Sequence, residues 1–241
     1  MMAEEEIKLI AHRGYRKQAV MNSIKAFQEA GKRHYWAIET DVRKTSDGIL
    51  VCSHDPVVDK LFDGKGEISK ISWEDLKKLP YKSGQKGRIP LFSEYLDICR
   101  AYGSLPFIET KTDDVPEVLK TAEEFFPDDE IILSSIQFRH LQMTREMNGN
   151  VFIHHIFGNR ETMKKLAEMG NAGMSLNCPD PDDASQEMID EIHSLGLKVC
   201  LRAGDSVEAV RKMMNLGLDY IPTNCVRPED VREEFDERIY S

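Results

Sequence analysis

The stretch SQEMIDEIHSLGLKVCLRAGDSVEAVRKMMNLGLDYIPTNC, residues 185–225, contains one pattern twice. Its first half places Ile189, Ile192 and Leu195 at helical spacing, which predicts an amphipathic helix with one apolar stripe. Leu-Gly-Leu ends that helix, with Gly196 as the stop signal, and a short apolar run begins almost at once. The second half repeats all of these features. Two helices that each lead directly into a short buried strand are typical of a parallel sheet covered by helices.

Short apolar runs of this kind recur along the whole chain, with predicted helices between most of them. Most are too apolar and too short for amphipathic helices, so we interpret them as strands buried on both faces. The runs are 7–13, 35–42, 106–111, 131–136, 151–156, 173–178, 198–203 and 220–225. Eight such units predict a TIM (β/α)8 barrel rather than a doubly wound open sheet. The acidic tail, 227–239, is the expected eighth helix.

One segment interrupts this rhythm after the second predicted strand. An extra strand-like piece, GILVCSHD, is followed by a long polar stretch at 57–90 in which Phe62, Trp73 and Tyr81 are scattered. In a barrel, insertions after a strand lie on the carboxyl-terminal face, where active sites are built. We therefore expect a single domain, residues 1–241, with a small insertion at about 57–90 on that face.

Composition and charge limit the classes of function. Of 241 residues, 41% are hydrophobic and 31% charged, which is the profile of a globular protein. A formal charge of −10 argues against a broad nucleic-acid interface, since that needs a basic face. We see no apolar run long enough to span a membrane and no signal peptide, so stable membrane insertion is not expected. Five widely spaced cysteines suit reduced thiols in the cytoplasm. The oligomeric state is not indicated.

Acidic side chains collect at the ends of two neighbouring predicted strands. Glu39 and Asp41 are two positions apart, so their side chains share one face of the strand. Glu109 and Lys111 have the same spacing on the next barrel strand. Taken alone, either pair is explained by ordinary strand-end charges or by a salt bridge.

Two histidines and an arginine are expected beside these acids. His12 and Arg13 end the first strand, and His54 ends the extra strand. His54 alone would be interpreted as a structural or solvated residue. The coincidence of all these residues at adjacent strand ends instead favours an active site.

The residue types indicate a chemistry. Three converging carboxylates are costly to bury unless a cation pairs with them, and oxygen ligands select a hard cation, Mg²⁺ or Ca²⁺. Two imidazoles can serve as base and acid near neutral pH. Arg13 and Lys111 suit a phosphate group. The set predicts cleavage of a phosphodiester.

Other histidines and neighbours receive more modest predictions. His154 and His155 alternate on one strand, so at most one faces the barrel interior. His34, His140 and His193 lie on or next to predicted helices and are expected at the surface. Thr40 should point into packing, and Asp55 should support His54 rather than bind a metal.

The chain resembles the glycerophosphodiester phosphodiesterase family. The resemblance lies in AHRG (11–14), NSIKAF (22–27), IETDVRKTSDGILVCSHDP (38–56), IPLFSEYLDIC (89–99) and FIETK (107–111), and continues weakly to LGLDYIPTN (216–224). The first half is highly specific, and the second is mainly barrel periodicity.

The resemblance implies a TIM barrel and hydrolysis of a small-molecule glycerophosphodiester to glycerol 3-phosphate and an alcohol. It implies general acid–base catalysis and leaves two nucleophiles open, water and the substrate's own glycerol hydroxyl. The residue roles that it implies are a divalent metal on Glu39, Asp41 and Glu109, catalysis by His12 and His54, and phosphate contacts from Arg13 and Lys111.

Several positions depart from the family's pattern. Met21 stands where the family has a glutamate, and Ile136 and Gln137 replace the usual Phe-Asp after Ser135. Arg202 replaces a pocket tryptophan, and Asn224 stands where an aspartate is common. We predict that Arg202 binds substrate and favours one with an extra anionic group.

Two alternatives remain. A lysophospholipase D or phospholipase C-like lipid phosphodiesterase on the same fold would need an apolar rim, which the polar insertion does not predict. A catalytically inactive binding homologue would not need paired histidines at a metal site.

Overall fold

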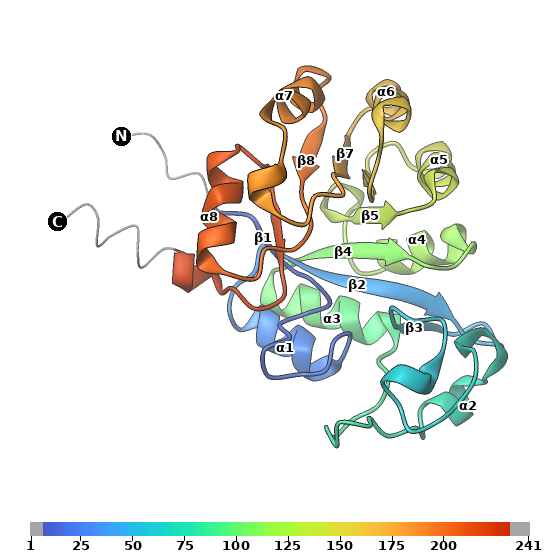
Figure 1. Ribbon diagram of the computed structural model, residues 1–241. Coiled ribbons are helices and arrows are strands. Elements are labelled where there is room, and N and C mark those ends of the chain that lie inside the picture. The colour runs from blue at the N-terminus through green and yellow to red at the C-terminus, as the bar shows by residue number, and fades with distance from the viewer. Residues whose placement is uncertain (1–6, 232–241) are drawn as a thin grey trace.

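Parallel strands form a barrel in the computed structural model, which describes residues 7–231 (Figure 1). The barrel strands are β1 (Leu9–Ala11), β2 (Ala37–Lys44), β4 (Leu105–Thr110), β5 (Ile132–Ser135), β6 (Phe152–His155), β7 (Ala172–Ser175), β8 (Lys198–Cys200) and β9 (Ile221–Thr223). Their order is β8-β7-β6-β5-β4-β2-β1-β9, and each neighbouring pair in this order is parallel. The backbone nitrogen of Asp219 donates to the Val199 oxygen at 3.1 Å, and that of Gly204 to the Pro222 oxygen at 2.9 Å. These two bonds join β8 to β9 and nearly close the barrel, which confirms the predicted fold.

Helices surround the barrel and connect successive strands (Figure 1). They are α1 (Ile24–Gly31), α3 (Phe92–Tyr102), α4 (Val115–Glu123), α5 (Phe138–Met147), α6 (Arg160–Met169), α7 (Gln186–Ser194) and α8 (Val207–Asn215), with short 3-10 turns η3 (Asp128–Glu130) and η4 (Pro181–Asp183) between them. A further helix follows β9 and begins at Pro228, within the range predicted for the last barrel helix, 227–239. The part of that range beyond Val231 lies outside the described residues.

The two repeats of residues 185–225 fold as their residues predict. Ser185 and Ser206 cap α7 and α8, because each side-chain oxygen accepts a backbone N–H of the first turn. Gly196 and Gly217 follow the helices with φ of 74° and 76°, a left-handed conformation that glycine adopts readily. A cap at the start and a glycine after the end set the bounds of both helices, and a barrel strand follows each of them.

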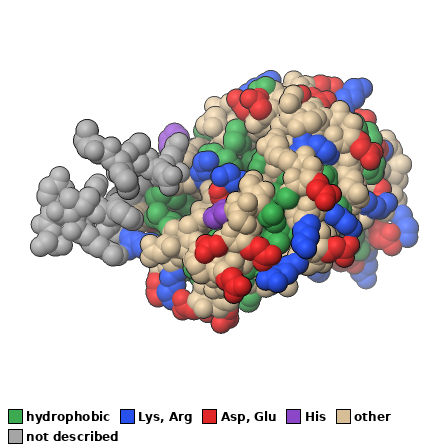
Figure 2. Space-filling model, turned by 90° about the horizontal axis from the view of Figure 1, so that it is seen from above, with side chains coloured by type: hydrophobic (Ala, Val, Ile, Leu, Met, Phe, Trp, Pro, Cys, Tyr) green, Lys and Arg blue, Asp and Glu red, His purple; other side chains and the backbone are tan. Residues whose placement is uncertain are grey.

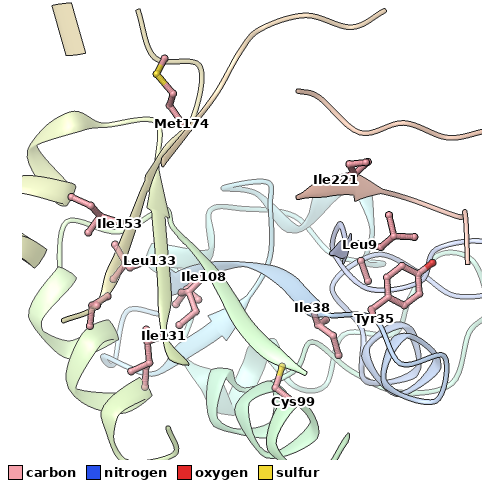
Figure 3. Close-up of a cluster of buried hydrophobic side chains, with 14 of the residues drawn as sticks. Leu9, Tyr35, Ile38, Cys99, Ile108, Ile131, Leu133, Ile153, Met174 and Ile221 are labelled. Atoms are coloured by element: carbon pink, nitrogen blue, oxygen red, sulfur yellow. The ribbon is translucent and has the colours of Figure 1, made fainter. Parts of the chain in front are cut away.

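Most of the core lies between the strands and the helices (Figure 3). The labelled side chains of Leu9, Ile38, Ile108 and Leu133 come from four neighbouring strands and point toward the helices. A second cluster inside the barrel includes Ile10, Ala37, Phe107, Ile132, Cys200 and Tyr220. Burial on both faces explains why the strands are nearly continuous apolar runs.

The insertion follows β3 (Leu50–Cys52), which pairs antiparallel with the far end of β2. It contains η1 (Val58–Lys60), η2 (Ile68–Lys70) and α2 (Trp73–Leu76). Two of the aromatic residues that are scattered along its sequence meet in the fold. Phe62 and Tyr81 are buried, with stacked ring centroids 4.7 Å apart, inside a small apolar cluster of the insertion.

The surface shown in Figure 2 carries acidic and basic side chains interspersed with one another. Within residues 7–231, no helix is both long enough and apolar enough to cross a membrane.

Candidate active site

Three acids meet at the carboxyl-terminal end of the barrel. Asp41 on β2 is directly opposite Glu109 on β4 in the parallel register, and Glu39 lies two residues before Asp41. One carboxylate oxygen from each lies within 4.8 Å of the others. Asp41 is fully buried, and Glu39 and Glu109 are only 6% and 7% exposed. The two-residue spacing and the strand register together produce the cluster that the sequence suggests.

The electrostatics of this cluster indicate a missing positive charge. Burial and the charge of Asp41 raise the pKa of Glu39 well above its usual value, and the same causes raise the pKa of Glu109 to about 7. Burial also acts to raise the pKa of Asp41, but Arg13 and Lys111 outweigh it and lower that pKa. The Oδ1 atom of Asp41 is buried and accepts no hydrogen bond from any described residue. Crowded buried carboxylates, one oxygen of which accepts no hydrogen bond, fit a hard divalent cation.

Two basic residues flank the acids. The Nε atom of Arg13 lies 3.2 Å from Asp41 Oδ2, and its Nη1 faces the sulfur of Met21 at 3.6 Å. A thioether is a weak acceptor, so Met21 leaves the guanidinium donors largely available. Lys111 pairs with Glu109 and lies 3.4 Å from Asp41 Oδ1. Both predicted phosphate-binding residues are therefore present at the site.

Asn22 holds Asp41 in place, a role that we did not predict. Its Nδ2 donates to Asp41 Oδ2 at 2.9 Å, and its Oδ1 accepts from the Thr40 hydroxyl at 2.9 Å. Asn22 is buried, with φ of 51°, and its backbone nitrogen donates to the Arg13 carbonyl. Asparagine is among the few residues other than glycine that tolerate this conformation. Thr40 therefore points away from the cavity, in agreement with prediction.

The backbone after β1 contacts Glu39, another acid of the cluster. Arg13 has φ of 60°, and its backbone nitrogen donates to Glu39 Oε2 at 2.8 Å. The loop that carries His12 and Arg13 is thus tied directly to the cluster.

The two predicted catalytic histidines line the same cavity. His12 follows β1, and its Nδ1 lies 2.9 Å from Asn224 Oδ1. Burial, followed by the charge of Arg13, lowers the pKa of His12 to about 4. His54 is more exposed, and its Nδ1 lies 3.4 Å from Asp55 Oδ1, as expected for a supporting carboxylate.

Arg43 also fixes His54 and was missed. Its Nε and Nη2 donate to the His54 carbonyl at 3.0 and 2.6 Å. Burial lowers the pKa of the His54 imidazole, and the charge of Asp41 acts against that change. Arg43 lies two residues beyond Asp41 on β2, and this alternation is the signal that could have identified it.

The cavity of about 280 Å³ has two unlike walls. The charged wall comes from β1, β2 and β4, and the opposite wall is mainly apolar. Ile136 and Phe157 line that wall and remain 56% and 37% exposed. Arg202 lies at the mouth, with its guanidinium carbon 5.3 Å from the centre of the Phe157 ring. The structure thus places Arg202 beside the cavity and across it from the acids.

The other histidines lie in three places: at the cavity, in packing contacts and at the surface. His154 lines the cavity, whereas His155 bonds to the Ser135 carbonyl and packs on Phe138. His34 and His193 are exposed, as predicted.

The prediction for His140 is wrong. Its side chain is fully buried and bonds to Ser135 Oγ at 3.0 Å and to Asp113 Oδ1 at 2.9 Å. The loop after β4 covers this face of α5, which helical spacing alone does not reveal.

A parallel barrel with acids suited to a cation and donors suited to phosphate defines a class, the phosphoric ester hydrolases. The model of the glycerophosphoryl diester phosphodiesterase family matches residues 12–227. The chain belongs to this family, and its enzyme class is glycerophosphodiester phosphodiesterase.

A curated relative agrees with this assignment, and solved structures share the fold. The chain is 29% identical over 228 residues to a glycerophosphodiester phosphodiesterase of Caldanaerobacter subterraneus subsp. tengcongensis, covering 89% of this chain and 93% of that one. A structure of an Oleispira antarctica phosphodiesterase with the product sn-glycerol-3-phosphate superposes with a TM-score of 0.84 at 22% identity, covering 95% and 96% of the two chains. A Thermotoga maritima glycerophosphodiester phosphodiesterase superposes with a TM-score of 0.77 at 20% identity, covering 96% and 98%. The two structures support the fold.

Proposed function

We propose that this chain hydrolyses glycerophosphodiesters to glycerol 3-phosphate and an alcohol, using a divalent cation held by Glu39, Asp41 and Glu109. The observation that carries the proposal is the buried carboxylate cluster, in which Asp41 Oδ1 accepts no hydrogen bond from a described residue and has only the Lys111 ammonium at 3.4 Å as a charged neighbour. A bound Mg²⁺ or Ca²⁺ supplies positive charge against the phosphoryl oxygens.

Arg13 and Lys111 bind the phosphate in this proposal. The Arg13 guanidinium pairs with Asp41 through Nε, so its outer edge can present donors to a phosphoryl oxygen. Lys111 now neutralises Glu109 and Asp41. The same ammonium group lines the cavity, where it could also contact a phosphoryl oxygen.

His12 and His54 transfer the protons. His12 suits the proton acceptor, because burial and Arg13 lower its pKa to about 4 and keep it neutral at pH 7. His54 is the proposed donor to the leaving alcohol: burial lowers its pKa, and the charges of Asp41 and Asp55 act against that lowering and favour the protonated form.

A panel of glycerophosphodiesters assayed with Mg²⁺, Ca²⁺ and Mn²⁺ tests the proposal. We expect glycerol 3-phosphate as product, loss of activity with a chelator, and loss in His12→Ala and His54→Ala. Binding of these substrates without turnover would instead indicate a catalytically inactive homologue. Turnover that the chelator leaves unchanged would refute the role of the cation.

Arg202 gives the site its preference for a substrate with an extra anionic group. Its guanidinium is exposed at the cavity mouth, where a carboxylate on the alcohol could reach it. Glycerophosphoserine and glycerophosphoethanolamine differ by one carboxylate. Arg202→Ala should lower kcat/KM for the serine compound about tenfold relative to the ethanolamine compound. Arg202→Lys should retain most of the preference for the serine compound. An unchanged ratio would refute this role.

A lipid phosphodiesterase, of the lysophospholipase D or phospholipase C type, is the second candidate function. The exposed Ile136 and Phe157 supply an apolar rim on the wall opposite the insertion. If this candidate holds, lysophosphatidylcholine will be hydrolysed faster than glycerophosphocholine, and Ile136→Ser will remove the difference. Met147→Ser is the control, because Met147 is 49% exposed away from the cavity.

We further propose a single domain and a cytoplasmic location. One apolar cluster includes residues from β1 to the last described turn, which supports one folding unit that carries the insertion. All five cysteines are unpaired, which suits a reducing compartment. Fractionation of the native cells and limited proteolysis are the corresponding tests.

A further inference from the structure

Asn224 contacts the Nδ1 side of the His12 imidazole. It follows β9, and its side-chain Oδ1 lies 2.9 Å from His12 Nδ1. The same oxygen accepts a hydrogen bond from Arg16 Nη1. On the other side, Asn224 Nδ2 donates to Asp205 Oδ2 at 2.7 Å, and the Asn224 backbone nitrogen donates to Asp205 Oδ1 at 2.9 Å.

These partners determine which end of the amide faces His12. A carboxylate such as Asp205 can only accept, and the guanidinium of Arg16 can only donate. The amide nitrogen must therefore face Asp205, and the amide oxygen must face Arg16 and His12. A flipped amide would oppose oxygen to a carboxylate and nitrogen to a guanidinium.

The amide orientation in turn decides the state of the imidazole. Because Asn224 offers only an oxygen, His12 Nδ1 must carry the hydrogen that joins them. In a neutral imidazole, hydrogen on Nδ1 leaves a lone pair on Nε2. Nδ1 is engaged with Asn224, and the ring lines the cavity, so Nε2 is the nitrogen available to accept a proton from a bound nucleophile.

We propose that Asn224, oriented by Asp205 and Arg16, is a positioning residue that fixes His12 in the tautomer with Nε2 unprotonated. This inference rests on the proposed role of His12 as proton acceptor. The positioning residue comes from the end of the barrel sequence and the histidine from its beginning. Both are tied by backbone bonds, from His12 to the Thr223 carbonyl and from Arg16 to the Asn224 carbonyl, each 3.0 Å.

The competing explanation is that Asn224 only ties three loops together. The two explanations differ in what its loss changes. A loop tie would alter thermal stability, substrate KM and cation affinity together. A positioning residue lowers kcat and changes the imidazole tautomer, while KM and cation affinity remain close to those of wild type.

The experiment uses the full chain with saturating Mg²⁺, with ¹⁵N-labelled histidine and steady-state kinetics on glycerophosphocholine. Wild type should show His12 protonated on Nδ1, with the signal assigned by its loss in His12→Gln. Asn224→Ala should lose this preference and lower kcat about ten- to hundredfold, with KM within about twofold. The matched control is Asn148→Ala, because Asn148 also donates to a carboxylate, that of Glu123, but far from the cavity.

A second variant tests the orientation without touching His12. Asp205→Asn keeps the size of the partner but removes its acceptor-only character, so it should give mixed tautomers and lower kcat several-fold. The proposal is overturned if wild-type His12 carries its hydrogen on Nε2, or if Asn224→Ala keeps kcat within twofold. It is also overturned if kcat falls only together with cation affinity. If His12→Gln itself retains full activity, it is the proposed function of His12 that fails.

Discussion

Replacing Asn22 should damage both the stability of the protein and the affinity of the proposed cation site. Asn22 is buried and joins Asp41 to Thr40 through its two amide atoms. It also holds φ of 51°, which an alanine adopts only at a cost. Asn22→Ala therefore removes these side-chain hydrogen bonds, together with a long one of 3.5 Å from the Asp41 backbone nitrogen, and adds backbone strain, whereas Asn22→Gly removes the same bonds without the strain.

The magnitudes follow from these contacts. Losing the bond to the charged Asp41 should cost about 1.5 kcal/mol, because Arg13 and Lys111 still compensate that carboxylate. Leaving the Thr40 hydroxyl without its acceptor should cost about 1–2 kcal/mol. The left-handed φ adds about 1 kcal/mol for alanine but not for glycine. We expect Asn22→Ala to lower the free energy of unfolding by about 4 kcal/mol and Asn22→Gly by about 3 kcal/mol.

Urea unfolding measures the two free energies, and calorimetric titration with Mg²⁺ or Ca²⁺ measures the affinity. Both variants should bind the cation about ten- to hundredfold more weakly than wild type, because Asp41 loses the group that orients it. Equal stability of the two variants would contradict the role of the backbone conformation. Wild-type cation affinity in both would refute the claim that Asn22 organises the metal-binding carboxylate.

Three further predictions concern pH, backbone geometry and the insertion. Burial lowers the pKa of His154 from 6.5 to about 3, so the unfolded chain binds an extra proton between these values and stability falls as pH falls through them. His154→Gln should reduce the slope of unfolding free energy against pH in that window. An unchanged slope would show that the buried His154 is not the source of this pH dependence. A Cβ at Gly14 would approach the carbonyl carbon of Ala26 to 2.7 Å, so Gly14→Ala should lower kcat and destabilise by about 2–4 kcal/mol. Gly84→Ala, also at positive φ but in open space, should cost only about 1 kcal/mol. If both variants lower the melting temperature equally, the clash with Ala26 is not the reason for the loss at Gly14. Phe62→Ala should speed amide hydrogen exchange in the insertion while the barrel strands stay protected, and uniform acceleration would show that the insertion does not open independently.

The barrel could be predicted because its signals are local. Capping serines, terminal glycines and apolar runs each act within a few residues, and the repeats at 185–225 contain all three. Apart from β2 and β4, the strands are shorter than the runs that predict them. β8 ends at Cys200, although its run continues to 203, because the chain leaves the barrel there and carries Arg202 to the cavity mouth.

The acids of the site could be predicted in part for the same reason. Alternation along a strand places Glu39 and Asp41 on one face, but only the register between β2 and β4 places Asp41 opposite Glu109. That register depends on the packing of the whole barrel. The sequence therefore suggests which residues face the same end and does not specify which atoms meet.

The residues that were missed depend on contacts between distant segments. Asn22 acts through a left-handed backbone and a strand that begins fifteen residues later. His140 is buried and bonds to Asp113, which comes from another loop, and to Ser135 on β5. Phe62 and Tyr81 are nineteen positions apart in a stretch that is polar overall, so their stacking has no periodic signal.

The central claim is that the buried acids hold a cation required for phosphodiester hydrolysis. The most direct measurement is the initial rate of glycerol 3-phosphate release from glycerophosphocholine by chelator-treated protein, before and after Mg²⁺ or Ca²⁺ is restored. We predict no release before addition, full recovery in wild type and no recovery in Asp41→Asn. Release by the stripped protein at the rate of untreated protein would contradict the claim, as would full recovery in Asp41→Asn.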